Sequence, residues 1–430
     1  MKYFLLAFLL SFTVFASPPH SLKRLIVKVN QGKNLPNSRL IRSSKKLFNN
    51  IFVVYSQNIS KLEKYLKQNN DIVYIEKDYL GTKNKLAKKS FDFNIDFSKD
   101  LGSPFNDPHV SRQWTLNDSE VNGISVKRTF FNRRSNPQEE IIVAVVDTGV
   151  DYNHPDLPMW TNEDEIPNNG IDDDNNGYID DIYGINTLVR DSNGNATMNV
   201  MDAHSHGTHV SGSIGAIQNN GIGIAGIASK VKIMAIRTVP NRSDETDVDV
   251  IEAFIYAAKN GAKIINCSFG KSHNEGGMAV SEAIEFIGKE YGVLVVAAAG
   301  NSSRNIDQYL SYPASFENSN LLVVASTSKY GSMSYFSNYG LKNVDVATPG
   351  SGIYSTTPRG NYSNMSGTSM ASPNTAGVAA EVLANYPNLT PEELKDIIIN
   401  SVTKVPSFSM RILSGGRIDL EKALKLALEK

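Results

Sequence analysis

One serine in the segment NMSGTSMASPNTAG (364–377) lies where its hydroxyl could act as a nucleophile. Ser369 follows a glycine and a threonine, at a point where a helix can begin. A serine hydroxyl attacks poorly until a histidine takes its proton, and a carboxylate on the other imidazole nitrogen holds that histidine in the right tautomer. By itself Ser369 is better explained as a helix N-cap, so a catalytic interpretation needs both partners.

Candidates for the two partners lie in two other segments. Asp147 ends the apolar run IIVAVVD, and a carboxylate at the end of a buried strand is costly unless it is paired. The segment SHGTHVSG (205–212) contains His206 and His209. From the residues alone, these histidines are either a weak metal pair, without the HExxH pattern, or one base beside one packing residue.

Asn301 closes the small-residue segment AAAGN (297–301). A side-chain amide at the end of such a strand can donate a hydrogen bond to an oxyanion. Backbone N–H groups in the first turn of a helix near Ser369 would face the same developing charge, and the helix dipole would add to the effect. An asparagine in a loop is common, so this signal is modest by itself.

The elements that must position these residues follow from the apolar pattern. From Ile141 onward, apolar runs alternate with helical stretches, which predicts an α/β fold with a parallel sheet covered by helices. Chemistry in such sheets collects at the carboxyl ends of strands, and three of the runs end in Asp147, Ser268 and Asn301. The predicted strands are 141–147, 231–239, 262–270, 292–301, 321–327 and 343–350, and the predicted helices are 247–260, 278–290 and one near the end, with Thr390 as N-cap, Pro391 at N1 and Glu393 at N3.

The front of the chain has a different character. Residues 22–80 predict a small α/β unit, and a lysine-rich exposed linker follows to about Ser103. Residues 18–105 hold 17 Lys and Arg against 7 Asp and Glu, whereas residues 106–430 hold 25 against 37. A basic arm can bind nucleic acid, but docking on the acidic remainder of its own chain is favoured. The predicted strands are 24–30, 50–56 and 71–79, with a helix at 60–69 N-capped by Ser60.

The first 16 residues predict a signal peptide, because Lys2 precedes an apolar run that ends near Val14 and Ala16. The run is short for a membrane span. The chain has one cysteine, Cys267, so it cannot form an intrachain disulfide. An exported protein of this kind must be stabilised by packing or by bound ions.

In chain order, the segments DTGV, HGTHVSG, AAGN and GTSMASP make residues 105–425 resemble the subtilisin-like serine peptidases. The resemblance implies a three-layer subtilisin-like fold with a central mainly parallel sheet. It also implies that Asp147 orients His206, that His206 is the general base and acid, and that Ser369 attacks. Asn301 and the Ser369 amide would form the oxyanion hole. His209 would be structural, so the resemblance implies that the two histidines do not form a zinc site.

The same resemblance implies where a substrate binds and how the chain is divided. Peptide backbone would pair with the segment NCSFG (266–270), which together with VVAAAG (295–300) would wall the pocket for the residue before the cut. The six substrate-binding residues are Ser268, Phe269, Gly270, Ala298, Ala299 and Gly300. The expected divisions are a signal peptide (1–16), a propeptide (17–100, with its junction within 81–106) and a peptidase domain (106–430) with an acidic insertion (158–205).

Two positions depart from the family pattern. Asn374 stands where many members have histidine, and Thr348 stands where alanine is usual. Neither removes a chemical group from the site, so we expect activity with altered packing beneath it.

Calcium is the expected cofactor. The resemblance implies that Asp156 in HPDL ligates a structural calcium, which the loop QNNGIGIAG completes. The alternative is a glycine-rich turn without an ion. The loop ligands would be the side chain of Asn220 and the carbonyls of Gln218, Ile222 and Ile224.

The core of the insertion, residues 162–181, has eight acidic residues and no basic one. Its spacing D-x-D-x-N-G-x-x-D is that of a calcium loop, although Tyr183 replaces the glutamate at position 12. The alternative is a solvated acidic loop. The candidate ligands are Asp172, Asp174, Asn176, Tyr178 and Asp180.

We therefore expect a secreted, extracellular or periplasmic, monomeric serine endopeptidase that removes its own propeptide. Its partners would be protein or peptide substrates and its own propeptide as inhibitor, with no nucleic acid and no membrane anchor after signal removal. The alternative is a non-catalytic calcium-dependent binding protein on the same scaffold. A convertase-like enzyme ranks low because no further domain follows Lys430, and the G-x-S-x-G elbow of lipases does not match GTSMA.

Overall fold

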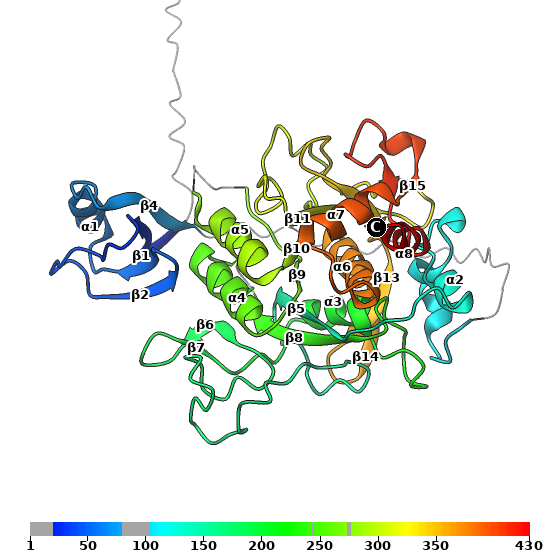
Figure 1. Ribbon diagram of the computed structural model, residues 1–430, viewed down its shortest axis with the longest axis horizontal. Helices are drawn as coiled ribbons and strands as arrows, with labels where there is room; N and C mark the ends of the chain where they lie inside the picture. The colour runs from blue at the N-terminus through cyan, green and yellow to red at the C-terminus, as the bar shows by residue number, and fades with distance from the viewer. Residues whose placement is uncertain (1–19, 80–102, 242–244, 273–276) are drawn as a thin grey trace, which may run out of the picture.

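The computed structural model describes residues 20–79, 103–241, 245–272 and 277–430. The signal peptide predicted at 1–16 and nearly all of the predicted junction at 81–106 lie outside the described residues. Two bodies are visible, a small N-terminal domain and a larger one (Figure 1). Within the described residues, no helix combines the length and apolarity needed to cross a membrane.

The larger body is built on one mixed sheet, which within the described residues has ten strands in the order β15-β16-β12-β11-β10-β9-β5-β8-β6-β7. The central strands are parallel, and the antiparallel pairs lie at the two edges. The strands are β5 (Ile141–Asp147), β6 (Asn186–Arg190), β7 (Ala196–Thr197), β8 (Val231–Arg237), β9 (Ile264–Cys267), β10 (Leu294–Ala298), β11 (Leu321–Thr327), β12 (Val346–Pro349), β15 (Thr403–Lys404) and β16 (Gly416–Arg417). This confirms the predicted α/β class with a mainly parallel central sheet.

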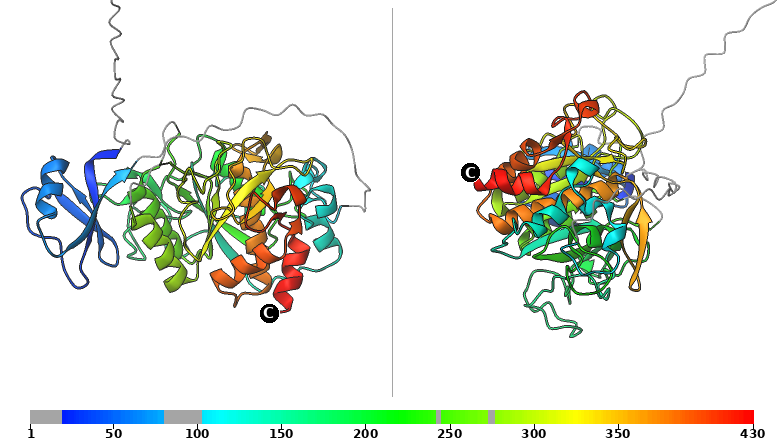
Figure 2. Two further views of the ribbon diagram at one scale, coloured as in Figure 1. Left: turned by 90° about the horizontal axis from the view of Figure 1, so that it is seen from above. Right: turned by 90° about the vertical axis from the view of Figure 1, so that its right-hand side faces the viewer.

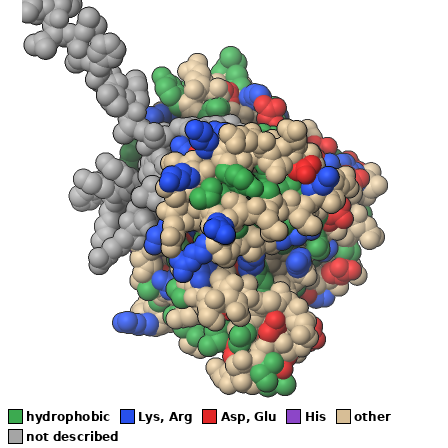
Figure 3. All heavy atoms as spheres, turned by 90° about the vertical axis from the view of Figure 1, so that its left-hand side faces the viewer, with side chains coloured by type: hydrophobic (Ala, Val, Ile, Leu, Met, Phe, Trp, Pro, Cys, Tyr) green, Lys and Arg blue, Asp and Glu red, His purple; other side chains and the backbone are tan. Residues whose placement is uncertain are grey.

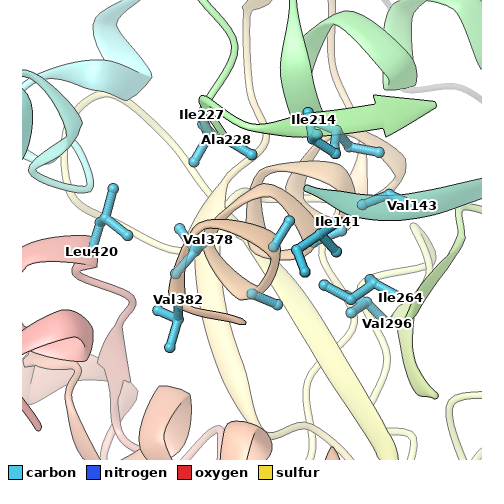
Figure 4. Packing of buried hydrophobic residues seen from close by; sticks show 14 of the residues in the cluster. Ile141, Val143, Ile214, Ile227, Ala228, Ile264, Val296, Val378, Val382 and Leu420 are labelled. Carbon is cyan, nitrogen blue, oxygen red and sulfur yellow. The ribbon is translucent and has the colours of Figure 1, made fainter. Parts of the chain in front are cut away.

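Helices cover both faces of this sheet (Figures 1 and 2). Along β5, Val143 and Val145 pack into one core, whereas Ala144 and Val146 pack into the other. Figure 4 shows the first core, where Ile214 and Val378 approach the sheet. The first face carries α3 (His206–Gly215), α6 (Thr368–Asn385), α7 (Pro391–Asn400) and α8 (Leu420–Leu428), and the second carries α4 (Asp247–Lys259) and α5 (Ala279–Tyr291). Burial on both faces explains why the strands read as continuous apolar runs.

The C-terminal helices agree with the sequence in part. The capping box predicted for α7 is present, with Thr390 and Glu393 bonded reciprocally and Pro391 at the start. The pattern at Thr390 indicated a terminal helix, but a further helix, α8, follows α7 and is N-capped by Asp419. The remaining elements are the antiparallel hairpin β13 (Ile353–Thr357) and β14 (Asn361–Met365), the helix α2 (Val126–Phe131), and the 3₁₀ turns η1 (Val110–Arg112), η2 (Trp114–Leu116), η3 (Ser119–Val121) and η4 (Pro406–Phe408).

The N-terminal domain is an antiparallel sheet, in the order β2-β3-β1-β4, packed on one helix. That helix starts at Ile59 and is N-capped by Asn58, whose side chain accepts from the Lys61 N–H, so the predicted cap at Ser60 is wrong. The strand β2 was not predicted, because most of its residues are polar and it has no apolar run. The elements are β1 (His20–Val29), β2 (Ser43–Phe48), β3 (Ile51–Tyr55), α1 (Ile59–Leu66) and β4 (Ile72–Tyr79).

Two carboxylates of β4 complete the N-termini of the two helices on the second face. Asp78 is fully buried and accepts from the Val248 N–H in α4 at 3.0 Å. Glu76 accepts from the N–H groups of Met278 and Ala279 at the start of α5. Because these N–H groups have no partner within their helices, the N-terminal domain supplies helix caps to the larger body.

Ion pairs add to this docking. Lys28 lies 2.8 Å from Glu282 in α5, and Arg24 pairs with Asp78 and, at 3.3 Å, with Asp249 in α4. Lys and Arg side chains are also spread over the outward face at this end of the molecule, where Asp and Glu are fewer (Figure 3). The basic domain therefore sits against acidic residues of the larger body.

Substitution Asp78→Ala should release the domain from α4. The change removes one partner of a buried pair and leaves the Arg24 guanidinium with weaker partners, which costs about 3–5 kcal/mol. Hydrogen exchange on the full chain should show lower protection in residues 20–79 and at the start of α4. Lys77→Ala, on the neighbouring position, should leave protection unchanged; equal protection in both variants would refute the capping role.

Candidate active site

Asp147 and His206 are joined at the carboxyl edge of the sheet. Asp147 ends β5, is 1% exposed, and its Oδ1 lies 2.7 Å from His206 Nδ1 at the start of α3. The same oxygen accepts from the Thr148 N–H at 2.7 Å. Because Nδ1 donates to Asp147, Nε2 is the nitrogen of the neutral imidazole that can accept a proton.

A glycine allows α3 to approach β5 this closely. A Cβ on Gly207 would lie 2.1 Å from the Gly149 carbonyl oxygen and 3.1 Å from Asp147 Cβ. Any side chain at this position would therefore push the helix, and His206 with it, away from Asp147. The crowding of small residues in this segment reflects that close approach.

Asp202 holds the same helix from its N-terminal side, although the sequence analysis did not identify it. Its Oδ2 accepts from the Thr208 N–H at 3.0 Å, and its Oδ1 accepts from the Thr148 hydroxyl at 3.0 Å. Thr148 in turn accepts from the Gly207 N–H at 3.1 Å. The only signal in the sequence was an aspartate four residues before His206, which by spacing alone suggests an ordinary turn residue.

His209 is fully buried and faces away from the reactive pair. Its Nε2 lies 3.0 Å from the Ile353 carbonyl oxygen and 3.1 Å from that of Ser363, so it ties α3 to the β13–β14 hairpin. Burial, together with the nearby His206, lowers the pKa of His209 to about 4. The ring therefore stays neutral at physiological pH, and its position supports a structural role rather than a shared metal site.

Ser369 lies in the first turn of α6 and is 7% exposed. Its Oγ donates to the Ser268 carbonyl at 3.0 Å, and the Ser268 hydroxyl donates to the Ser369 carbonyl at 3.0 Å. Pro373 explains the second bond, because proline has no N–H to offer to the carbonyl four residues earlier. Ser268 satisfies that carbonyl and so attaches the start of α6 to the end of β9.

The amide of Asn301 is fixed in one orientation. Its Oδ1 accepts from the Thr368 N–H at 2.8 Å and from the Thr368 hydroxyl at 2.9 Å, so its Nδ2 points the other way. A Cβ on Gly367 would lie 3.4 Å from Asn301 Nδ2 and 3.6 Å from Ser369 N. Two nitrogen atoms that carry N–H groups thus lie around one small space beside Gly367, an arrangement suited to an oxyanion.

The predicted substrate segments lie beside each other. Residues 268–270 follow β9 and residues 298–300 include the end of β10, and these two strands are parallel neighbours. The N-terminal domain reaches the same edge: the Tyr79 backbone N–H donates to Asp247, and Lys271, next to Gly270, lies 5.9 Å from the Tyr79 ring centre.

The two departures from the family pattern are accommodated by hydrogen bonds. The Asn374 amide donates to the Pro349 carbonyl at 2.8 Å, and the hydroxyls of Thr348 and Thr375 lie 2.7 Å apart. All of these side chains are buried, so their polar groups need the partners that they have.

The loop around Asp156 gathers oxygen ligands. Asp156 Oδ1 accepts from Asn220 Nδ2 at 2.9 Å, and its Oδ2 accepts from the Ile224 N–H and the Tyr362 hydroxyl, each at 3.0 Å. Asp107, which the sequence analysis missed, accepts from the Asn220 N–H at 3.2 Å. Burial, with a contribution from Asp107, raises the pKa of Asp156 to about 6. Of the other predicted ligands, Gln218 turns its amide to the Gly226 carbonyl, and Ile222 donates its N–H to Asn220.

In the acidic insertion, one carboxylate oxygen each from Glu165, Asp172 and Asp174 lie within 4.8 Å of one another. Glu165 lies outside the predicted spacing and was missed. Asp180 is turned to the N–H groups of Asn169 and Gly170, apart from these three.

The other two predicted residues of the insertion serve neighbouring contacts. Asn176 donates its side-chain amide to Asp174 and to Asp181, and the Tyr178 hydroxyl donates to Glu252. Burial, with a contribution from the charge of Asp181, raises the pKa of Glu165.

Comparison with known proteins identifies relatives of the chain. The sequence profile of the Subtilase family matches residues 138–415. The chain is 34% identical to Subtilisin-like protease 1 of Plasmodium berghei over 84% of its own length and 60% of that protein's. It is 35% identical to Thermitase of Thermoactinomyces vulgaris over 66% of its own length and 88% of that protein's.

A solved structure gives the same result for the fold. The proteases from Pseudoalteromonas arctica match with a TM-score of 0.61 and 27% identity, covering 76% of this chain and 100% of that one. The chain spans only 60% and 53% of the Plasmodium berghei and Plasmodium vivax proteins that it matches.

Substitution Gly367→Ala should place a methyl group in the space that the two N–H donors face. The nearest contacts of 3.4 and 3.6 Å are ordinary, so the fold and the unfolding temperature should be retained. The methyl group should keep the oxyanion from at least one of these donors. Because removal of one donor lowers turnover about 10²–10³-fold in a subtilisin, labelling of Ser369 by a fluorophosphonate should slow by at least about tenfold. The exposed neighbour variant Ser302→Ala should label like wild type; a normal rate for Gly367→Ala would show that the space takes no part.

Proposed function

Because the chain belongs to the subtilase family, we propose that it is a secreted serine endopeptidase that cuts peptide bonds with Asp147, His206 and Ser369 and matures by removing its own N-terminal domain. The observation that carries this proposal is the Asp147–His206 pair at 2.7 Å, at the same edge of the sheet as Ser369 and its two flanking N–H donors.

The proposed reaction has two halves, formation of an acyl enzyme and its hydrolysis, and the same side chains act in both. The Ser369 hydroxyl turns from the Ser268 carbonyl to His206 Nε2, gives up its proton and attacks the substrate carbonyl. The resulting oxyanion receives hydrogen bonds from Asn301 Nδ2 and Ser369 N. His206 then donates the proton to the leaving amine, and water attacks the acyl enzyme by the same route.

Substrates would be proteins or peptides in extended conformation. The 268–270 segment continues a strand whose backbone can pair with such a chain, and residues 298–300 wall the adjacent pocket. Cys267 does not compete as a nucleophile, because burial raises the pKa of its thiol well above the ordinary value. The resident inhibitor would be the N-terminal domain, since Tyr79 leads to this same edge.

Maturation tests the proposal directly. The intact mass of the secreted wild-type chain should show loss of about the first hundred residues, whereas Ser369→Ala and His206→Ala should lose only the signal peptide. The wild-type mass also locates the junction within residues 81–106. If the variants mature like wild type, another protease makes the cut. If no form matures or labels with a fluorophosphonate, the non-catalytic binding protein is favoured.

Calcium fits both oxygen-rich loops, and we propose one ion at each. At the first, Asp156 would act with the carbonyls of Gln218, Ile222 and Ile224, and turning over the Asn220 amide would present its oxygen. Asp107 adds a second carboxylate there. At the second, Glu165 would join Asp172 and Asp174, whose carboxylate oxygens lie within 4.8 Å of one another. Hard carboxylate and carbonyl oxygens are the ligands that calcium takes, and binding only the folded state would stabilise it.

Removal of calcium should therefore lower the unfolding temperature. Calcium at about 100 times its dissociation constant contributes about 2.7 kcal/mol per site, so EDTA should produce a clear fall. Atomic mass spectrometry should count two ions per chain, and one in either Asp156→Asn or Glu165→Gln. Glu163→Gln, at an exposed position in the same insertion, should keep both; an unchanged count in all variants would exclude these ligands.

A further inference from the structure

The acidic insertion contacts the N-terminal domain through residues that neither the catalytic nor the calcium proposal explains. Lys45 in β2 is the point of contact. Its Nζ donates to Asn195 Oδ1 at 2.9 Å and lies 5.4 Å from the Tyr178 ring centre, both in the insertion. Its third partner is Glu252 in α4, at 2.9 Å.

Glu252 joins the insertion to this contact. It is 4% exposed, and besides Lys45 it accepts from the Tyr178 hydroxyl at 3.0 Å and pairs with Arg190, at the end of β6. Burial would raise the pKa of Glu252, but the charges of Arg190 and Lys45 outweigh it and hold that pKa below its usual value. Glu252 is thus a buried, charged acceptor whose partners come from both the insertion and the N-terminal domain.

The neighbouring acidic residue of α4 is shared in the same way. Asp249 lies 2.5 Å from Arg190 of the insertion and 3.3 Å from Arg24 of the N-terminal domain. Residues three apart on a helix lie on one face, so Asp249 and Glu252 present a single acidic face. Arg190 of the insertion pairs with both carboxylates of this face. The N-terminal domain adds Arg24, which pairs with Asp249, and Lys45, which pairs with Glu252.

We propose that the acidic insertion is part of the docking surface for the chain's own N-terminal domain, and that it recognises Lys45. The recognised chemistry is an ammonium group on a small antiparallel sheet, bound by an amide oxygen, an aromatic ring and a buried carboxylate. The insertion thereby makes docking specific for this basic domain and slows its release. Only the step of release depends on the proposed function, since docking is a property of the uncut chain.

Hydrogen exchange on the uncut Ser369→Ala chain measures docking without catalysis. Lys45→Met keeps the length of the side chain but removes its charge, which leaves Glu252 with one cationic partner fewer. Exchange in β2, β3 and residues 178–195 should rise about tenfold, the scale of one charged hydrogen bond of about 1.4 kcal/mol. Asn195→Ala, on the insertion side, should raise exchange in β2 by a smaller factor.

Lys46→Met is the matched control, because Lys46 is the exposed neighbour of Lys45 in the same strand. It should leave exchange unchanged in every segment. Equal exchange in Lys45→Met and Lys46→Met would overturn the proposal, and so would an effect of Lys45→Met confined to α4 with residues 178–195 unaffected.

Release is then measured in the chain with Ser369 intact. After secretion, co-elution of the cleaved N-terminal domain with the larger body should fall in Lys45→Met and Asn195→Ala but not in Lys46→Met. If the wild type is never cleaved, the proposed function fails while the exchange result still decides the docking surface. If cleavage occurs and the three variants co-elute alike, the insertion has no part in retention.

Discussion

The charge of Asp147 imposes the strictest requirement on the structure, because this carboxylate ends a strand buried on both faces. A buried charge is tolerated only when it is paired and hydrogen-bonded. His206 meets that need from 2.7 Å, which requires α3 to lie unusually close to β5. Gly207 permits the approach and Asp202 holds the start of the helix. The histidine is thus oriented by its pairing with a buried carboxylate, and Nε2 is the nitrogen that can take part in proton transfer.

The position of α6, the other helix at this edge, depends on a missing hydrogen bond and not on a buried charge. Pro373 leaves the Ser369 carbonyl without its helical partner, and Ser268 supplies the missing hydrogen bond. The same contact brings the Ser369 hydroxyl to the end of β9, beside the segment proposed to hold substrate. Thr368 then fixes the Asn301 amide. The missing N–H of Pro373 and the hydrogen bond from Thr368 to Asn301 therefore set the positions of the nucleophile and of one donor beside it.

The sequence predicted those features that have a local pattern. Burial on both faces gives the central strands continuous apolar runs, so these strands were predicted. The predicted strand 262–270 was too long: β9 ends at Cys267, because Ser268 bonds to the start of α6. The motifs also indicated the residues of the site. Asp202 and Glu165 were missed because they act on backbone N–H groups that only folding brings to them. The strand β2 was missed because its sequence is mostly polar, and the partners of Lys45 lie more than a hundred residues away in the chain.

The interface between the two bodies has a consequence for folding. The N-cap of α5, Met278, has no capping side chain, and Glu76 of the N-terminal domain occupies the N–H groups at that helix start. Asp78 does the same for α4 while it is buried against Arg24. The ends of both helices are therefore completed by residues outside the larger body, and the proposed removal of the domain would return those N–H groups to water. The central sheet is mainly parallel and its contacts are remote in sequence, so loop closure opposes folding before those contacts form; we expect the completion of two helix ends to favour folding at that slow stage.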